Sequence, residues 1–247
     1  MAEYKRPASL MPMATGYCPG CMHALATRLV ADVIDELNQA DNAINVVSVG
    51  CSALNLYSWK GDVIGSAHGR APAVATGIKR CLPDRLVFTY QGDGDLAANG
   101  LAEIMSAANR GENFTVVFAN NQTYGMTGGQ MAPTTLIGQK TTTSRFGRDA
   151  LTTGYPLKMC ELISVLEAPV FVARYALNSV KGVQDAKKGI KKAFEMQMAG
   201  KGFTFIELLT NCPTNWGMNP LDTLDYMNTN TIPYFKPGIY KDKEAEA

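Results

Sequence analysis

The feature that most constrains the fold is a series of short apolar runs, rich in β-branched residues, with helical patterns between them. The runs cover residues 44–49, 86–90, 114–119, 169–173 and 203–209. Because their hydrophobicity is continuous rather than alternating, they predict strands that are covered on both faces. Apolar residues recur at helical spacing in residues 23–39, 71–80, 101–109 and 183–198. This alternation predicts an α/β fold, with three layers (α/β/α) and a mostly parallel sheet.

The chain of 247 residues is long enough to bury a large core. We expect an N-terminal arm over residues 1–16, one cofactor-binding domain over residues 17–211, and a proline-rich segment over residues 212–247 that wraps over the surface. Residues 122–156 are rich in Thr and Gly and show little periodicity, which predicts a long loop with a functional or interface role.

Charge and hydropathy exclude several classes of protein. The 23 Lys and Arg balance the 22 Asp and Glu without a long basic block, which argues against nucleic-acid binding. No apolar stretch reaches the ~20 residues of a membrane span, and residues 1–12 lack the apolar run of a secretion signal. We therefore expect a cytoplasmic protein. Only 18% of its residues are charged, below the ~25% of average proteins, which indicates a subunit partly covered by partners.

A segment rich in Gly and Asp follows directly after the second predicted strand. It contains Gly92, Asp93, Gly94 and Asp95 and precedes a helix, and Asn121 ends the next strand. Glycine amides and a helix N-terminus favour an anion such as phosphate. Carboxylate and amide oxygens suit Mg²⁺. Each piece alone is a common turn or strand exit, but one helix plus one strand separates them, so both reach the same edge of the sheet. Together they predict a site for Mg²⁺ and phosphate.

Four cysteines lie in segments that the predicted sheet brings together. Cys18 and Cys21 form a Cys-Pro-Gly-Cys turn, Cys51 follows the first strand, and Cys212 follows the last. The first pair alone is ambiguous among a redox dithiol, half a zinc site and half an iron–sulfur site. For Cys51 or Cys212 taken singly, an inert buried thiol is the simpler interpretation. Four thiolates together would satisfy a [4Fe–4S] cluster or a tetrahedral zinc ion.

Six short segments together resemble the β subunit of the 2-oxoacid:ferredoxin oxidoreductases. They are residues 17–21 (YCPGC), 50–52 (GCS), 68–71 (HGRA), 92–95 (GDGD), 124–130 (YGMTGGQ) and 212–217 (CPTNWG). They occur in one order and span most of the chain. The GDG segment, followed about 26 residues later by Asn, also resembles the diphosphate-binding motif of thiamine-diphosphate enzymes in general. The resemblance implies the thiamine-diphosphate-binding fold, with residues 17–211 as the cofactor domain.

This resemblance implies three cofactors: thiamine diphosphate, Mg²⁺ and a [4Fe–4S] cluster. The implied cluster ligands are Cys18, Cys21, Cys51 and Cys212. The implied Mg²⁺ ligands are Asp93, the side chain of Asn121 and the backbone carbonyl of Thr123. The other residues expected at the cofactors are Ser52, His68, Gly69, Arg70, Gly92, Gly94, Asp95, Tyr124 and Gly125.

The implied activity is the coenzyme-A-dependent oxidative decarboxylation of a 2-oxo acid, with electrons passed through [4Fe–4S] clusters to ferredoxin. The implied partners are an α subunit that faces the aminopyrimidine ring, a γ subunit and a ferredoxin-like δ subunit, so the chain is expected to be inactive alone. Leu54, three residues after Cys51, offers no partner to a distal carboxylate. We therefore expect a branched substrate such as 2-oxoisovalerate, with 2-oxoglutarate and pyruvate as the alternatives.

Other interpretations stay open at this point. A non-redox thiamine-diphosphate decarboxylase or synthase subunit would use its cysteines for zinc or for nothing, and a zinc-stapled nucleotide-binding module would not be an enzyme. His68 is the one candidate catalytic residue, although a loop histidine bonded to backbone is nearly as simple an interpretation. We expect His23, Cys81 and Cys160 to be structural.

Overall fold

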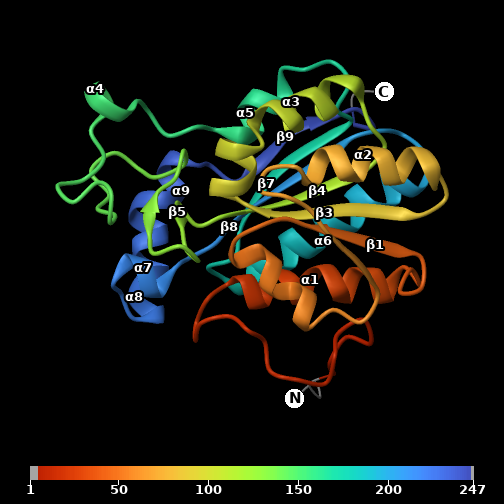
Figure 1. The fold of residues 1–247 in the computed structure, drawn as a ribbon, viewed down its shortest axis with the longest axis horizontal. Coiled ribbons are helices and arrows are strands. Elements are labelled where there is room, and N and C mark those ends of the chain that lie inside the picture. Colours follow the sequence, from red (N-terminus) through yellow and green to blue (C-terminus); the bar gives the residue numbers. More distant parts are fainter. Residues whose placement is uncertain (1–4, 246–247) are drawn as a thin grey trace.

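The computed structural model describes residues 5–245 and shows a central sheet between two layers of helices (Figure 1). The strands lie in the order β2 (Asp62–Gly65), β1 (Ala43–Val47), β3 (Leu86–Gly92), β4 (Thr115–Asn120), β8 (Thr204–Leu209), β7 (Phe171–Ala176) and β9 (Gly238–Asp242). Every neighbouring pair is parallel except β7 and β9. The predicted fold class is confirmed. The predicted division at residues 16 and 211 stays a prediction, and residues 1–4 and 246–247 lie outside the described part.

Five of the seven strands coincide with the predicted apolar runs to within a few residues. The other two, β2 and β9, are the edge strands of the sheet. Most residues of these two strands are exposed or half-buried. A strand at an edge does not need the continuous apolar run that marks a strand buried on both faces. The pattern that finds the centre of the sheet therefore misses its edges.

Helices cover both faces of the sheet. Figure 1 shows α1 (His23–Glu36) and α6 (Val180–Met198) on one face, and α2 (Ala71–Cys81), α3 (Leu101–Arg110) and α5 (Met159–Ser164) on the other. Each face has its own apolar core. The remaining short elements are η1 (Cys51–Tyr57), η2 (Gly94–Asn99), β5 (Thr123–Tyr124), β6 (Gln130–Met131), α4 (Ala150–Thr153), α7 (Pro213–Trp216), α8 (Pro220–Tyr226), η3 (Met227–Thr231) and α9 (Ile232–Tyr234).

A buried ion pair links the central strands. The side chains of Arg174 on β7 and Glu207 on β8 are both 0% exposed, and their charged atoms lie 2.9 Å apart. Glu207 also accepts a hydrogen bond from Asn120 Nδ2 at 2.8 Å, and Arg174 forms a second ion pair with Glu161 at 2.7 Å. Three neighbouring strands are thus fixed together directly beside the carboxyl end of β4.

The segment between β6 and α5 extends away from the body of the molecule and carries α4 (Figure 1). Two of its apolar side chains are almost completely exposed, Phe146 at 100% and Leu151 at 96%. The long loop predicted for this part of the chain is present. In the described residues no helix combines the length and the hydropathy that a membrane crossing requires.

Candidate functional site

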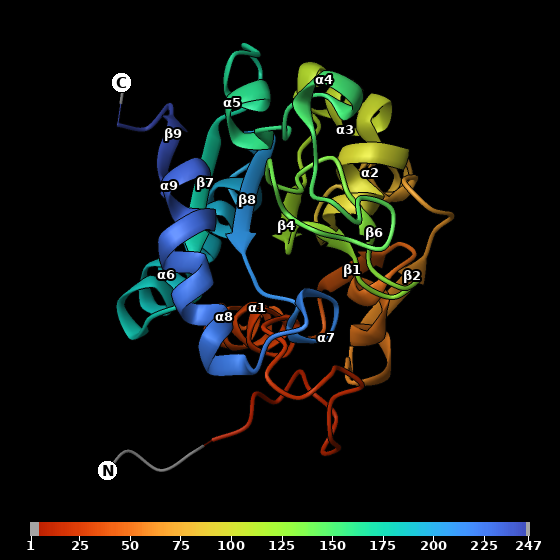
Figure 2. The same ribbon diagram turned by 90° about the vertical axis from the view of Figure 1, so that its left-hand side faces the viewer.

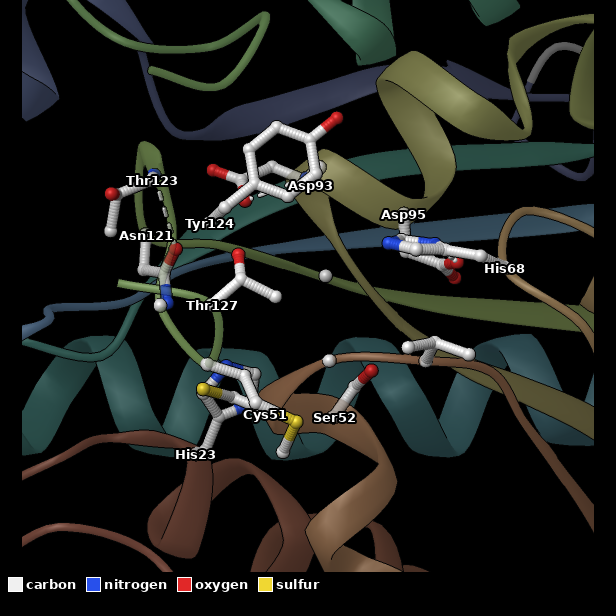
Figure 3. A pocket seen from close by; sticks show the side chains of 16 residues that line it. His23, Cys51, Ser52, His68, Asp93, Asp95, Asn121, Thr123, Tyr124 and Thr127 are labelled. Atoms are coloured by element: carbon white, nitrogen blue, oxygen red, sulfur yellow. Dashed lines mark hydrogen bonds and ion pairs between the residues drawn. The ribbon is translucent and has the colours of Figure 1, made fainter. Parts of the chain in front are cut away.

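A pocket lies at the edge of the sheet where the parallel strands end, between the loops that follow β1, β3 and β4. Figure 3 shows Asp93, Asn121 and Thr123 toward one end of it, His68 to one side, and Cys51 at the opposite end. The cavity that this chain encloses is about 40 Å³, room for a few water molecules. A ligand of cofactor size would therefore be only partly enclosed by this chain.

Asp93 is the most buried acidic group of the pocket wall, with 2% exposure. Its Oδ1 accepts a hydrogen bond from the Gly94 amide at 2.9 Å, and its Oδ2 accepts one from Thr134 Oγ1 at 2.6 Å. Burial raises the pKa of Asp93 to about 6, although these hydrogen bonds oppose the shift. No Lys or Arg stands among the described residues of the wall. A bound divalent cation would supply the missing positive charge.

Asn121 lies beside Asp93 because β3 and β4 are paired in parallel, with Gly92 opposite Ala119. Asn121 and Thr123 are both 3% exposed. The Thr123 amide donates to Asn121 Oδ1 at 3.3 Å, so the loop folds back on this side chain. The structure thus brings the three predicted Mg²⁺ ligands to one end of the pocket, where their oxygens form a donor set of the kind that Mg²⁺ prefers.

Two features of the wall concern its packing and its free hydrogen-bonding capacity. A Cβ on Gly94 would lie 2.4 Å from the ring of Tyr124, so only glycine fits there. Tyr124 is held in place by its hydroxyl, which donates to Asn99 Oδ1 at 3.2 Å. The Ser52 hydroxyl lines the pocket and is buried without a hydrogen-bond partner in residues 5–245 (Figure 3). An orphaned buried hydroxyl is costly unless something bound there pairs with it.

The carboxylate of Asp95 is surrounded by donors of this chain. Its Oδ1 lies 2.5 Å from His68 Nδ1, and accepts from the Gly69 amide at 2.6 Å and from Ser48 Oγ at 2.7 Å. Its Oδ2 accepts from Gln91 Nε2 at 2.6 Å. In the structure Asp95 holds the turn that carries His68 into the pocket wall. The expected contact of Asp95 with a diphosphate stays a prediction.

The remaining predicted residues divide into two groups. Gly92 and Gly125 line the pocket. Gly69 and Arg70 do not: a Cβ on Gly69 would lie 2.5 Å from the backbone at Asn99, and the Arg70 guanidinium pairs with Glu103. Gly69 therefore serves close packing, and Arg70 points to α3. Their predicted contact with a cofactor stays a prediction that this geometry does not support.

The four predicted cysteines gather at the other end of the pocket. Burial, followed by repulsion from the other thiols of the set, raises the pKa of Cys51 to about 12. Burial likewise raises the pKa of Cys21 to about 11, with smaller contributions from Cys212 and Cys18. A Cβ placed on Gly125 would lie 3.0 Å from Cys51 Sγ and 3.7 Å from Cys212 Sγ. These thiols oppose one another's ionisation, so as thiolates they need a positively charged group between them.

The four cysteines could bind a cluster or a single ion. A tetrahedral zinc site can be built from four thiolates. A [4Fe–4S] cluster is also held by four cysteine thiolates, each on a different iron. The preference for a [4Fe–4S] cluster therefore rests on the family resemblance rather than on distances between the sulfurs.

Two of the six cysteines stay outside this set, as predicted. Cys160 is buried on α5, where Glu207 and Arg174 influence it. Cys81 is exposed at the end of α2. Neither has one of the four cysteines among its described electrostatic partners.

Sequence reasoning missed Asn211, a buried residue that connects two cysteine segments. Its Oδ1 accepts from the Met22 amide at 2.9 Å, and its Nδ2 donates to the Gly20 carbonyl at 3.1 Å and to Thr223 Oγ1 at 2.7 Å. These bonds hold the Cys-Pro-Gly-Cys turn against the segment that carries Cys212, and Figure 2 shows α7 next to the start of α1. The only signal in the sequence is that Asn211 directly precedes a cysteine.

His23 was expected to be structural, yet it also forms part of the pocket wall. It is 1% exposed, its Nδ1 lies 2.7 Å from the Tyr90 hydroxyl, and its ring stacks on Tyr17. Burial lowers the pKa of His23 to about 4, so the ring is neutral at physiological pH. A neutral, fixed imidazole separates the cysteine end of the pocket from the apolar core beneath it.

Comparison with known proteins agrees with this geometry. Residues 48–208 match the family described as "Thiamine pyrophosphate enzyme, C-terminal TPP binding domain". The chain is 49% identical over 243 residues to "Ketoisovalerate oxidoreductase subunit VorA" of Methanothermobacter marburgensis, covering 98% of this chain and 51% of that protein. It is 44% identical to the protein of the same name from Methanothermobacter thermautotrophicus, again covering 51% of it. The chain thus spans about half the length of these curated relatives.

Two further relatives are matched over most of their length. "2-oxoglutarate synthase subunit KorB" of Methanocaldococcus jannaschii is 35% identical over 235 residues, covering 92% of this chain and 82% of that protein. A solved structure of a 2-oxoglutarate:ferredoxin oxidoreductase from Magnetococcus marinus, with 2-oxoglutarate, coenzyme A and succinyl-CoA bound, superposes with a TM-score of 0.82 at 26% identity. That superposition covers 98% of this chain and 86% of the other.

Proposed function

The chain belongs to the 2-oxoacid:ferredoxin oxidoreductase family and contains a thiamine-pyrophosphate-binding domain, and on that premise we propose that it works as the cofactor-binding subunit of such an enzyme. The reaction is the coenzyme-A-dependent oxidative decarboxylation of a 2-oxo acid to acyl-CoA and CO₂, with ferredoxin as the electron acceptor. The observation that carries the proposal is a single pocket with a hard oxygen donor set at one end and, at the other, Cys51 with three further cysteines close enough to influence it.

The two ends of the pocket have separate tasks in this proposal. Asp93, Asn121 and the Thr123 carbonyl hold Mg²⁺, and the Mg²⁺ binds the diphosphate. Thiamine diphosphate supplies an electron sink for decarboxylation, and the iron–sulfur cluster accepts electrons. Ser52, whose hydroxyl has no partner among the described residues, donates into the space between them. The ring of Tyr124 packs on Gly94 and keeps water from that side of the anion site.

We propose an apolar, branched 2-oxo acid such as 2-oxoisovalerate as the substrate. Two relatives with 44% and 49% identity are named for ketoisovalerate, whereas the relative named for 2-oxoglutarate is 35% identical. Val49 and Met126 give the described pocket wall an apolar part, and no Lys or Arg of that wall could pair with a distal carboxylate. Leu54, on which the sequence argument for this substrate depended, is not in the wall. The apolar character therefore rests on Val49 and Met126.

We propose that other subunits complete the site: an α subunit facing the aminopyrimidine ring, a γ subunit and a ferredoxin-like δ subunit. The small cavity supports this, because it leaves most of a cofactor for another chain to cover. The extended segment supports it as well, because Phe146 and Leu151 are apolar side chains that a partner would bury. We place this assembly in the cytoplasm, on the grounds of composition alone.

The proposal is tested on the complex purified without oxygen from cells that make all of its subunits. We expect visible charge-transfer absorbance, four irons per copy of this chain in addition to those of the ferredoxin-like subunit, and thiamine-dependent reduction of ferredoxin by 2-oxoisovalerate with coenzyme A. A colourless complex that contains zinc and releases an aldehyde would favour the non-redox thiamine enzyme instead. A kcat/KM at least tenfold higher for 2-oxoglutarate, about 1.4 kcal/mol in transition-state free energy, would overturn the substrate assignment.

A further inference from the structure

Asn215 lies on α7, three residues after Cys212, and its side chain contacts both the cysteine end of the pocket and the loop after β4. Its Nδ2 donates to the Gly125 carbonyl at 2.9 Å and lies 3.3 Å from Cys212 Sγ. An asparagine NH₂ group has two hydrogens, so one nitrogen can donate to both acceptors at once. One side chain thus links a predicted cluster ligand to the loop that carries Thr123 and Tyr124.

The orientation of this amide is fixed by its surroundings. If the amide were reversed, its oxygen would face the Gly125 carbonyl oxygen and the Cys212 sulfur, both of which are acceptors. Gly129 packs against the oxygen side of the amide. A Cβ on Gly129 would lie 2.6 Å from Asn215 Oδ1. Gly129 also has φ +78°, which favours glycine. The sequence GGQ in this loop therefore provides the space that the asparagine occupies.

The contact with sulfur matters most when a cluster is bound. Asn215 Nδ2 donates toward Cys212 Sγ, and this sulfur carries negative charge as a thiolate ligand. The charge on this sulfur grows when a bound cluster accepts an electron. A donor at this position then stabilises the reduced cluster more than the oxidised one.

We propose that Asn215 is a positioning residue that raises the reduction potential of the [4Fe–4S] cluster by donating to Cys212 Sγ while holding the Gly125 carbonyl. This inference rests on the proposed function, because it requires the cluster to be present. Hydrogen bonds to the sulfurs are one of the features by which a protein sets the potential of such a cluster. The shared donor also holds the loop that carries Thr123 and Tyr124 next to Cys212.

The test compares the wild-type complex with Asn215→Leu and Asn215→Asp, which keep the approximate size of the side chain but remove the donor. Thr214→Ala is the matched control, since Thr214 is the exposed neighbour on the same helix. Iron content is measured first, and the cluster is then titrated electrochemically with electron paramagnetic resonance detection. We expect the ratio of reduced to oxidised cluster at a fixed potential to fall about tenfold in Asn215→Leu, a shift of about 59 mV for one electron.

Asn215→Asp should shift the potential further in the same direction, because it adds negative charge beside the sulfur, and Thr214→Ala should match the wild type. An unchanged potential in Asn215→Leu with full iron overturns the inference, and if that variant lacks iron, Asn215→Asp decides in its place. Loss of iron in both variants also overturns it, because a residue that only tunes a cluster is not needed to hold one. A wild-type complex without any cluster would instead overturn the proposed function.

Discussion

The two ends of the pocket are built in different ways. At the Mg²⁺ end, Asp93 and Asn121 stand at the ends of two neighbouring strands whose register fixes their separation. At the cysteine end, the ligands come from the turn at 18–21, from η1 and from the segment after β8, which are far apart in the sequence. One end is therefore a product of strand pairing, and the other depends on loops that meet.

The two ends of the pocket also differ in how many hydrogen bonds link their segments. Asp95 alone forms four hydrogen bonds with three segments beside the Mg²⁺ end. At the cysteine end, Asn211 provides the bonds between the Cys-Pro-Gly-Cys turn and the segment of Cys212. An end that is held by the sheet should survive the loss of its ligand. An end that is held by a few loop contacts should depend on the group bound there.

The largest expected effect is a loss of cofactor binding at the Mg²⁺ end with no change at the cysteine end. Asp93→Ala removes the one charged ligand among the three proposed for Mg²⁺. Because loss of even an outer-shell partner costs 10–100-fold in metal affinity, thiamine diphosphate should bind at least about 100-fold more weakly. Iron content and the spectrum of the cluster should not change. Calorimetric titration with thiamine diphosphate and Mg²⁺, together with iron analysis, measures both. Asp84→Ala, at an exposed site, is the control; undiminished binding in Asp93→Ala would contradict the assignment.

The reverse change breaks the cysteine end. Cys18→Ser should lose or convert the cluster, because serine is a poor ligand for iron and Cys18 is exposed to solvent. Thiamine diphosphate should still bind, since Cys18 is not part of the pocket wall. Iron analysis and cofactor titration again provide the measurement. Cys160→Ser is the matched control and should keep all of its iron; iron loss there would show that the ligand set is wrong.

A smaller effect tests whether Asn211 holds the cysteine loops together. Asn211→Leu keeps the volume but leaves the Met22 amide and the Gly20 carbonyl without this partner, at a cost of ~1–3 kcal/mol for each buried group. Thermal unfolding should occur several degrees lower, and iron should be lost faster to a chelator. The affinity for thiamine diphosphate should stay close to the wild type. Equal losses at both ends would show that the two ends are not independent.

The smallest effect lies at the boundary between the two ends. Gly125→Ala adds a methyl group 3.0 Å from Cys51 Sγ and 3.7 Å from Cys212 Sγ. The Cys51 sulfur must move by a few tenths of an ångström, which we expect to cost of order 1 kcal/mol. The cluster should form, with an altered paramagnetic resonance spectrum and faster loss of iron, while Gly77→Ala on α2, where a Cβ meets nothing, should behave like the wild type. An unaltered spectrum would mean that the sulfurs lie farther from Gly125 when a cluster is bound.

The same difference explains what the sequence could predict. Strands that are buried on both faces leave long apolar runs, so β3, β4 and the residues at their ends, Asp93 and Asn121, could be placed in advance. The roles of Asn211 and Asn215 could not, because each depends on contacts with segments 90 or more positions away. Arg70 was assigned to the cofactor from a motif, yet its partner Glu103 lies on a different helix. A motif states which residues occur together, but not which way each one points.

A cavity of about 40 Å³ encloses only a small part of a molecule the size of thiamine diphosphate, and in the proposed assembly a partner subunit covers the rest. Binding of thiamine diphosphate and association of the subunits are then two linked binding equilibria of the same chain. If bound cofactor raises the affinity between the subunits by some factor, the bound partner subunit raises the affinity for the cofactor by the same factor. Dilution below the dissociation constant of the complex should therefore release the cofactor, and excess cofactor should protect the complex against dilution. The apparent affinity for thiamine diphosphate is thus a function of protein concentration.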